Sequence, residues 1–163
     1  DNMSVLGLTI DYGPYGWLEN YDPNWTPNTT DAGQRRYRFG NQAAIGVWNL
    51  MQLGNALYPL IEDAAPLEEI LENYQTDYLP KHVQMMSGKL GLKEEDADFI
   101  LELEKLLYMS EMDMTIFFRN LSKFDEKNPQ EFWTKIEDAS YSEAIEKFKA
   151  QWTHFLANYA QKL

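Results

Sequence analysis

Hydrophobic residues recur at helical spacing along most of the chain. A first helix is predicted from Asn41, which suits an N-cap, to Pro59. Its apolar stripe consists of Ile45, Trp48, Leu53 and Leu57. A second helix is predicted to begin near Pro66, which fits a first helical turn, and to end or kink at Pro80 because proline lacks a backbone N–H. Its apolar positions are Ile70, Leu71, Tyr74 and Tyr78.

The C-terminal part of the chain also predicts helices. A turn is indicated by Ser87-Gly88 and Gly91, and a third helix should start near Lys93. The core positions of that helix are Ile100, Leu103 and Leu107. Shorter helices are expected at 114–121 and 129–136. Ser140 and Glu143 form a capping-box pattern before a last helix that runs to the end. Its apolar face consists of Ile145, Phe148, Trp152, Phe155, Leu156 and Tyr159.

The first 41 residues have a different pattern. Residues 5–10 read VLGLTI, a short apolar run with β-branched residues that predicts a buried strand ending in the turn at Asp11. Residues 13–41 are rich in proline and glycine but also in aromatic residues, which is typical of an ordered loop. The predicted class is therefore mainly α, with a short β element and a long loop at the N terminus.

Composition narrows the partners. The chain has 163 residues, enough for one domain or a piece of a larger one, and its 44% apolar content can supply a packed core. The net charge of −12 argues against nucleic acid, whose phosphates require a basic surface. No apolar run approaches the roughly 18 residues of a membrane span, so we expect no membrane partner. Cysteine is absent. The first residue is Asp1, and we expect the protein to continue upstream of it.

Charged residues are unevenly distributed. Between Glu62 and Asp113, acidic residues far outnumber lysines. This excess indicates either a solvated helical surface, the simpler interpretation, or an acidic docking face for a basic partner. The three arginines of the loop, Arg35, Arg36 and Arg38, are the only basic residues before Lys81. They could hold a phosphate or an acidic substrate segment, or they could pair with nearby carboxylates and fix the loop.

Two carboxylates and one amide flank the predicted strand. Asp1, Asn2 and Asp11 carry the oxygen ligands that Mg²⁺ prefers. A strand of this length would separate Asn2 from Asp11 unless a turn brought them together. On spacing alone, these residues are better explained as turn formers at the ends of a strand than as metal ligands.

Three stretches of the sequence resemble a known family. They are DNMSVLGLTIDYGPYGWLENYDP at 1–23, RRYRFGNQAAIGVWNLMQLGNAL at 35–57 and DMTIFFRNLS at 113–122. Together they resemble the selenoprotein O (SelO) family of protein-kinase-like pseudokinases. The resemblance is dense over residues 1–58, recurs at 113–122 and is weak elsewhere. It implies that residues 1–41 are the remainder of a catalytic loop, a strand, a DYG turn and an activation-segment-like loop, and that 42–163 form a helical subdomain of the C-lobe.

The same resemblance implies an activity and a site. Members of the family transfer AMP from ATP to Ser, Thr or Tyr hydroxyls of protein substrates. Asp1 resembles the proton-accepting aspartate, Asn2 a metal ligand, and Asp11 a metal ligand that also lies near the nucleotide. The expected cofactors are Mg²⁺ or Mn²⁺, with ATP as co-substrate. With these roles supplied by the family, the metal interpretation of the three residues replaces the turn interpretation.

The resemblance also implies what these 163 residues lack. No Gly-rich phosphate loop is present, and no lysine precedes Lys81. We therefore expect the chain alone to be inactive and to bind ATP weakly or not at all. Two alternatives stay open: a non-catalytic helical scaffold that uses the acidic 62–113 surface, and transfer of UMP in place of AMP. A cytoplasmic location in a bacterium is expected from the family.

Overall fold

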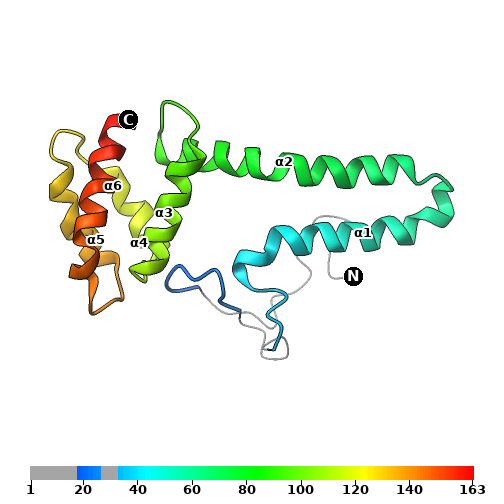
Figure 1. The fold of residues 1–163 in the computed structure, drawn as a ribbon, viewed down its shortest axis with the longest axis horizontal. Helices are drawn as coiled ribbons and strands as arrows, with labels where there is room; N and C mark the ends of the chain where they lie inside the picture. Colours follow the sequence, from blue (N-terminus) through cyan, green and yellow to red (C-terminus); the bar gives the residue numbers. More distant parts are fainter. Residues whose placement is uncertain (1–17, 27–32) are drawn as a thin grey trace. The chain divides into compact units, whose positions relative to one another are not determined.

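Helices dominate the residues that the structure describes. The computed structural model describes residues 18–26 and 33–163, and within these ranges it contains six α-helices and no β-strand (Figure 1). The helices are α1 (Gln42–Ile61), α2 (Ala65–Leu90), α3 (Ala97–Met109), α4 (Met114–Asn120), α5 (Trp133–Ala139) and α6 (Lys149–Lys162). Short 3-10 helices occupy Phe39–Asn41, Leu121–Lys123, Pro129–Phe132 and Ile145–Phe148. The mainly α class is confirmed, whereas the strand expected at 5–10 lies outside the described residues.

The described residues divide into two compact units. Unit 1 contains residues 23–26 and 33–81, and unit 2 contains residues 18–22 and 82–163. The helix α2 therefore contributes its first part to unit 1 and residues 82–90 to unit 2. The functional division expected between residues 41 and 42 stays a prediction.

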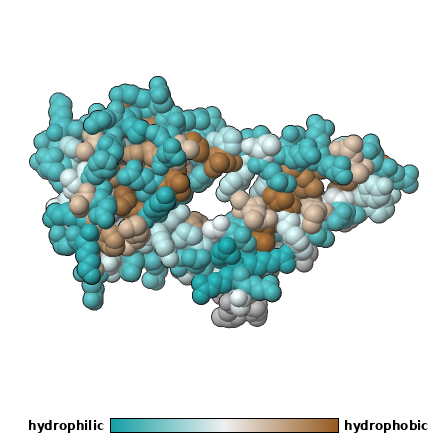
Figure 2. All heavy atoms as spheres, in the orientation of Figure 1, coloured by the Kyte–Doolittle hydropathy of each residue, from teal (hydrophilic) through white to brown (hydrophobic). Residues whose placement is uncertain are grey.

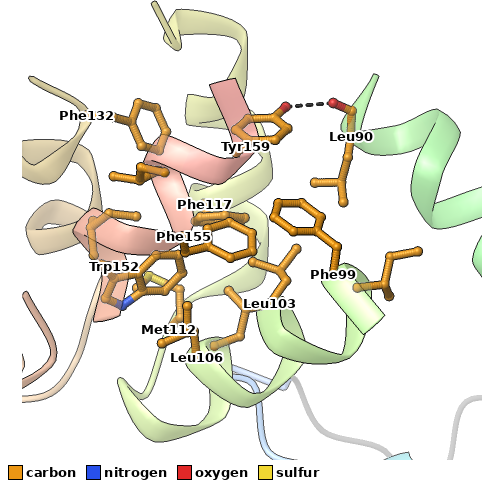
Figure 3. Packing of buried hydrophobic residues seen from close by; sticks show 14 of the residues in the cluster. Leu90, Phe99, Leu103, Leu106, Met112, Phe117, Phe132, Trp152, Phe155 and Tyr159 are labelled. Carbon is orange, nitrogen blue, oxygen red and sulfur yellow. Dashed lines mark hydrogen bonds between the residues drawn. The ribbon is translucent and has the colours of Figure 1, made fainter. Parts of the chain in front are cut away.

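All buried hydrophobic residues of the described chain lie in unit 2. Its core is built on aromatic rings from α3 and α6, with Phe99 and Phe155 stacked at a centroid distance of 4.5 Å (Figure 3). Trp152 meets Phe155 edge to face at 5.7 Å and is fully buried. Such offset and edge-on ring pairs add to the stability gained from burying their area. The stripe predicted for α3 is confirmed, since Ile100, Leu103 and Leu107 are buried. Of the stripe predicted for the last helix, Trp152, Phe155, Leu156 and Tyr159 are buried, whereas Ile145 and Phe148 are partly buried and lie in the 3-10 helix before α6.

Several buried polar groups of unit 2 are hydrogen-bonded to backbone carbonyls or to one another, although Ser87 Oγ and Trp133 Nε1 are buried without a hydrogen-bond partner among the described residues. Ser110 donates from its hydroxyl to the carbonyl of Leu106 and accepts a hydrogen bond from Trp152 Nε1 at 3.2 Å. Tyr159 donates to the carbonyl of Leu90 at 2.6 Å, the bond drawn in Figure 3. Because an unpaired polar group in a core is costly, these bonds fix how α6 lies against the ends of α2 and α3.

Unit 1 is built on a helical hairpin. A Cβ atom on Gly46 of α1 would collide with the hydroxyl of Tyr74, and one on Gly54 would lie 4.0 Å from the Cβ of Leu67. The earlier glycine of α1 therefore faces the later residue of α2, and the later glycine faces the earlier one. This order shows that α1 and the first part of α2 run antiparallel and close together. The polypeptide reverses at Glu62, which has a left-handed φ of 55° and donates its amide to the carbonyl of Tyr58.

The proline and turn predictions for these two helices are wrong in detail. Pro59 lies inside α1, which continues to Ile61, and Pro80 lies inside α2 without ending it. Ser87 and Gly88 are helical, so the turn comes only at Gly91, where φ is +71°. The residues of α2 that follow Pro80 bury Val83, Met86 and Leu90 in the core of unit 2. This burial outweighs the one backbone hydrogen bond that a proline removes.

Two predicted helix starts also need correction. The third helix begins at Ala97, because Asp96 caps it by accepting the amide of Phe99 at 2.9 Å. Ser140 does not cap the last helix, which begins at Lys149. Instead Ser140 pairs with Met112 in an isolated antiparallel bridge, and its hydroxyl donates to the carbonyl of Ser110 at 2.6 Å. The capping-box prediction failed because this long-range pairing uses the same side chain.

Candidate functional site

The predicted catalytic and metal-binding residues are Asp1, Asn2 and Asp11. All three lie outside the described residues, so their arrangement stays a prediction. Among the described residues, no group of three or more His, Asp or Glu side chains could hold a metal ion. The described residues that follow these three in the sequence, up to the start of α1, are 18–26 and 33–41.

The loop of unit 1 is closed at its base by backbone pairing. The amide of Gly40 donates to the carbonyl of Pro23 at 2.8 Å, and the amide of Phe39 donates to the carbonyl of Trp25 at 2.9 Å. A Cβ atom on Gly40 would lie 2.8 Å from the Cβ of Pro23 and 2.9 Å from its carbonyl oxygen. Only glycine fits this approach, because no rotation of a side chain moves a Cβ atom away from a neighbouring backbone.

The start of α1 is joined to the same loop. Asn41 occupies the predicted N-cap position but makes no side-chain cap; its Nδ2 donates to the carbonyl of Arg36 at 2.6 Å. The side-chain amide of Gln42 donates to the carbonyl of Tyr37 at 2.9 Å. These bonds connect the arginine segment to the first turn of the helix, so the conformation of the loop depends on α1.

The three arginines contact backbone and rings. Arg35 donates to the carbonyl of Asn24, and Arg38 donates to the carbonyl of Arg35, both at 3.3 Å. The guanidinium of Arg36 lies 3.7 Å from the ring centroid of Trp48, a cation–π contact. No ion pair with a carboxylate is found for them in residues 18–26 and 33–163. The predicted pairing with carboxylates is therefore not found among the described residues, where the arginines contact carbonyls and an aromatic ring instead. That they hold a phosphate or an acidic substrate segment stays a prediction.

Tyr21 anchors residues 18–22 within unit 2. Its amide donates to the carbonyl of Met112 at 2.7 Å, and its side chain packs against the core. Burial, with a smaller contribution from the negative charge of Glu104, raises the pKa of the Tyr21 phenol to about 12. Glu104 also lies 3.1 Å from Nε2 of His82. Sequence reasoning missed this cluster because its three members are distant along the chain and match no motif.

The acidic residues between 62 and 113 perform several local tasks. Asp96 caps α3 and pairs with Lys162 of α6 at 2.5 Å, and Asp113 caps α4 while accepting a hydrogen bond from Tyr141. Most of the other acidic side chains in this stretch are exposed. This distribution agrees with the simpler interpretation of a solvated surface whose few partly buried carboxylates cap or pair. No helix among the described residues is long and apolar enough to cross a membrane.

Comparison with known proteins identifies the class of protein. Relatives share 61% identity over 125 residues in Flavobacterium johnsoniae, 53% over 145 residues in Aromatoleum aromaticum and 47% over 167 residues in Xanthomonas axonopodis pv. citri. These alignments cover 75%, 87% and 100% of this chain. Each of the three relatives is described as protein nucleotidyltransferase YdiU. The sequence is therefore similar to that of enzymes that transfer nucleotides to proteins.

The family itself follows from a match along the entire chain. The family model described as protein adenylyltransferase SelO matches residues 1–163. The chain belongs to this SelO family, which confirms the resemblance noted in the sequence. It spans only 24%, 27% and 32% of the length of the three relatives. The 163 residues therefore correspond to a part of a SelO-family protein.

Proposed function

We propose that the full-length protein transfers AMP from ATP to Ser, Thr or Tyr hydroxyls of other proteins. The observation that carries this proposal is the match of the protein adenylyltransferase family model to all 163 residues. The names of the relatives, protein nucleotidyltransferases, support the same reaction class. The relatives are bacterial, which fits a cytoplasmic location.

Three residues are assigned to the chemistry. Asp1 would accept the proton of the attacking hydroxyl, while Asn2 and Asp11 would hold Mg²⁺ or Mn²⁺. Their donor atoms are carboxylate and amide oxygens, the ligands that these hard cations accept, so the donor set fits the ion. The ion would neutralise phosphate charge during transfer. Asp11 would also lie near the nucleotide, so its carboxylate has two tasks in this assignment.

The described loop would present the protein substrate. Residues 1–41 would contain the catalytic loop, the DYG turn and an activation-segment-like loop, and 42–163 would form the helical C-lobe subdomain. Within unit 1, the pairing of Gly40 with Pro23 supports a fixed base for this loop. A fixed base would favour catalysis by helping to hold the acceptor hydroxyl in place before the reaction.

Substitution of Asp11 tests the assignment. In the full-length protein, Asp11→Asn keeps the size of the side chain but removes its charge, and we expect it to abolish transfer of labelled AMP to a protein acceptor. Asp77→Asn is the matched control, because Asp77 is an exposed helical carboxylate paired only with Lys81. Normal transfer by Asp11→Asn, with the control also active, would remove the role given to Asp11.

The nucleotide donor needs a separate test. The relatives are named for nucleotidyl transfer in general, whereas the family description specifies adenylyl transfer. Labelled ATP and labelled UTP should be offered to the full-length protein with Mg²⁺ and then with Mn²⁺. We expect AMP incorporation to exceed UMP incorporation with both ions. Preferred use of UTP would keep the reaction class and change the donor.

The 163-residue chain alone should not carry out the reaction. It lacks a Gly-rich phosphate loop and has no lysine before Lys81, so few groups can hold a triphosphate. We expect calorimetry to show weak or no ATP binding by this chain. Micromolar or tighter binding would contradict that expectation. Complete inactivity of the full-length protein with every donor would instead favour a helical scaffold.

A further inference from the structure

The helix α1 has an unusual composition for a surface helix. Its 20 residues, Gln42–Ile61, contain no Asp, Glu, Lys or Arg. A helix that covers a core normally carries charged residues on its solvent side, whereas a helix without them is normally buried all round. Yet Asn49 is the only residue of α1 that is buried within the described chain. The composition and the exposure of α1 therefore disagree.

The disagreement is greatest in the C-terminal half of α1. Leu57, Leu60 and Ile61 are spaced by three and four residues and so share one side of the helix. Their exposed fractions are 37%, 83% and 44%. Met51 and Tyr58 are exposed at 40% and 48%. Leu57, Leu60 and Ile61 are named here the α1 apolar face, and Figure 2 shows apolar residues on the visible surface of the hairpin.

The first part of α2 continues this pattern within unit 1. Ile70 and Leu79 are exposed at 58% and 62%, although both are large and aliphatic. Scattered apolar residues are normal on a protein surface, but an adjoining group on a helix without charges marks an interface. The helix α1 therefore has the composition of a buried element and the exposure of an unpartnered one, whereas the first part of α2 carries Glu68, Glu69, Glu72, Asp77 and Lys81.

A buried polar atom in unit 1 lacks a partner as well. Among the described residues, Nη2 of Arg36 is inaccessible to solvent and has no hydrogen-bond acceptor, as Ser87 Oγ and Trp133 Nε1 of unit 2 also lack partners, and the Arg36 guanidinium lies over Trp48 of α1. Buried guanidinium nitrogens are normally hydrogen-bonded. An acceptor supplied by additional polypeptide beside α1 would complete this group.

The length of the relatives indicates what covers the α1 apolar face. The chain corresponds to only 24–32% of the three relatives described above, so most of a SelO-family protein lies outside these 163 residues. We infer that the α1 apolar face docks onto that remaining polypeptide and becomes part of the core of the full-length protein. A second copy of the chain is the competing occupant.

One substitution in two proteins tests the docking. Leu60→Lys keeps a good helix former and, in the 163-residue chain, replaces a side chain that is 83% exposed. We expect this variant of the short chain to unfold at the same temperature as the parent. In the full-length protein the same substitution would bury a charge, and we expect its unfolding temperature to fall by several degrees or the protein to become insoluble. Unchanged unfolding of the full-length variant would overturn the inference.

A matched control separates docking from a general effect of lysine. Leu101 of α3 is exposed at 48% and belongs to unit 2. Leu101→Lys should leave the unfolding temperature unchanged in both proteins. If Leu101→Lys destabilised the full-length protein as much as Leu60→Lys, the effect would not be specific to the α1 apolar face and the inference would fail.

Hydrogen exchange and mass measurement complete the test without any substitution. Amides of α1 should exchange at least about tenfold more slowly in the full-length protein than in the 163-residue chain. Equal rates would overturn the docking. The short chain should also be monomeric by light scattering. A dimer that Leu60→Lys converts to a monomer, with no destabilisation of the full-length protein, would assign the face to a second copy instead. None of these measurements involves nucleotide, so they stand apart from the test of AMP transfer.

Discussion

The helices α1 and α3 show how differently the two units use apolar residues. The helix α3 contains Asp98, Glu102, Glu104 and Lys105, yet it buries Phe99, Ile100, Leu103, Leu106 and Leu107. The helix α1 has no charged residue and buries only Asn49. In unit 2, α6 and α5 present apolar faces to the core, whereas the described part of unit 1 offers α1 its hairpin neighbour and the short loop segment that leads into it.

This contrast teaches that apolar content and burial are separate properties. The hydrophobic effect scales with the area removed from water, so an apolar stripe stabilises a fold only when a second surface covers it. In unit 2 that surface is within the described chain. In unit 1 it is not, so substitutions in unit 2 should have much larger effects on the stability of the 163-residue chain.

The largest effect is expected from Trp152→Ala in unit 2. Trp152 is fully buried, lies 5.6 Å from the ring of Phe117 and donates to Ser110. Its loss would leave a cavity and remove one of the two hydrogen bonds of the Ser110 hydroxyl, and we expect a cost of about 3–5 kcal/mol in the free energy of unfolding. Urea denaturation followed by circular dichroism measures this cost. Trp48→Ala in unit 1 is the matched control and should cost much less, because Trp48 is only partly buried. Equal losses would break the comparison.

An intermediate effect is expected from the cap of α3. Asp96→Ala removes the acceptor for the amide of Phe99 and the ion pair with Lys162, and we expect a cost of about 1–2 kcal/mol. Asp96→Asn is the control, because asparagine also caps helices but carries no charge. It should cost less than Asp96→Ala in the same denaturation experiment. If alanine and asparagine were equivalent, the cap would not contribute.

The pH dependence of Asp96 sharpens this prediction. The hydrogen bond from Lys162, followed by that from the amide of Phe99, lowers the pKa of the Asp96 carboxyl. Because the folded pKa is depressed, the stabilisation is present above the ordinary pKa and is lost as pH falls through the lowered value. Below pH of about 4, the thermal midpoint of the parent should therefore fall more steeply than that of Asp96→Asn. Parallel curves would contradict the shift.

The smallest effect is expected at Tyr21, and only in alkali. Burial, then the charge of Glu104, raises the pKa of its phenol from 10.0 to about 12. The neutral phenol is favoured in the folded protein, so its contribution is intact below pH 10.0 and is lost as pH rises towards about 12. Tyr21→Phe cannot ionise, and its stability should fall less than that of the parent across this window. Glu104→Gln should shift the phenol titration, followed by ultraviolet absorbance, to lower pH. Identical alkaline profiles for Tyr21→Phe and the parent would exclude the shift.

Local periodicity predicted the helices and core of unit 2 well. The buried positions of α3 and α6 could be predicted because their apolar residues recur every three to four positions and pack against other residues of the same chain. The continuation of α2 past Pro80 could not be predicted from the sequence. It depends on the burial of Val83, Met86 and Leu90, which comes from tertiary contacts and not from the local sequence. Ser140 was misassigned for the same reason, since its partners Ser110 and Met112 are about 30 residues away.

The candidate site was predicted from the resemblance to the SelO family and not from the chemistry and spacing of its residues. Spacing alone favoured turns for Asp1, Asn2 and Asp11, and the family supplied their metal and catalytic roles. The described residues do not include them, so these roles stay predictions. The grouping of Tyr21, His82 and Glu104 could not be predicted at all, because it arises from tertiary packing without a sequence signature.

The backbone pairing of Gly40 with Pro23 and of Phe39 with Trp25 has a consequence for evolution. These two hydrogen bonds hold together the ends of the intervening sequence just before α1 begins. Doubling the number of residues between such ends costs only about 0.6 kcal/mol of closure entropy. Insertions between Thr26 and Gly33 should thus be tolerated without shifting the start of the helix, whereas replacement of Gly40 should not.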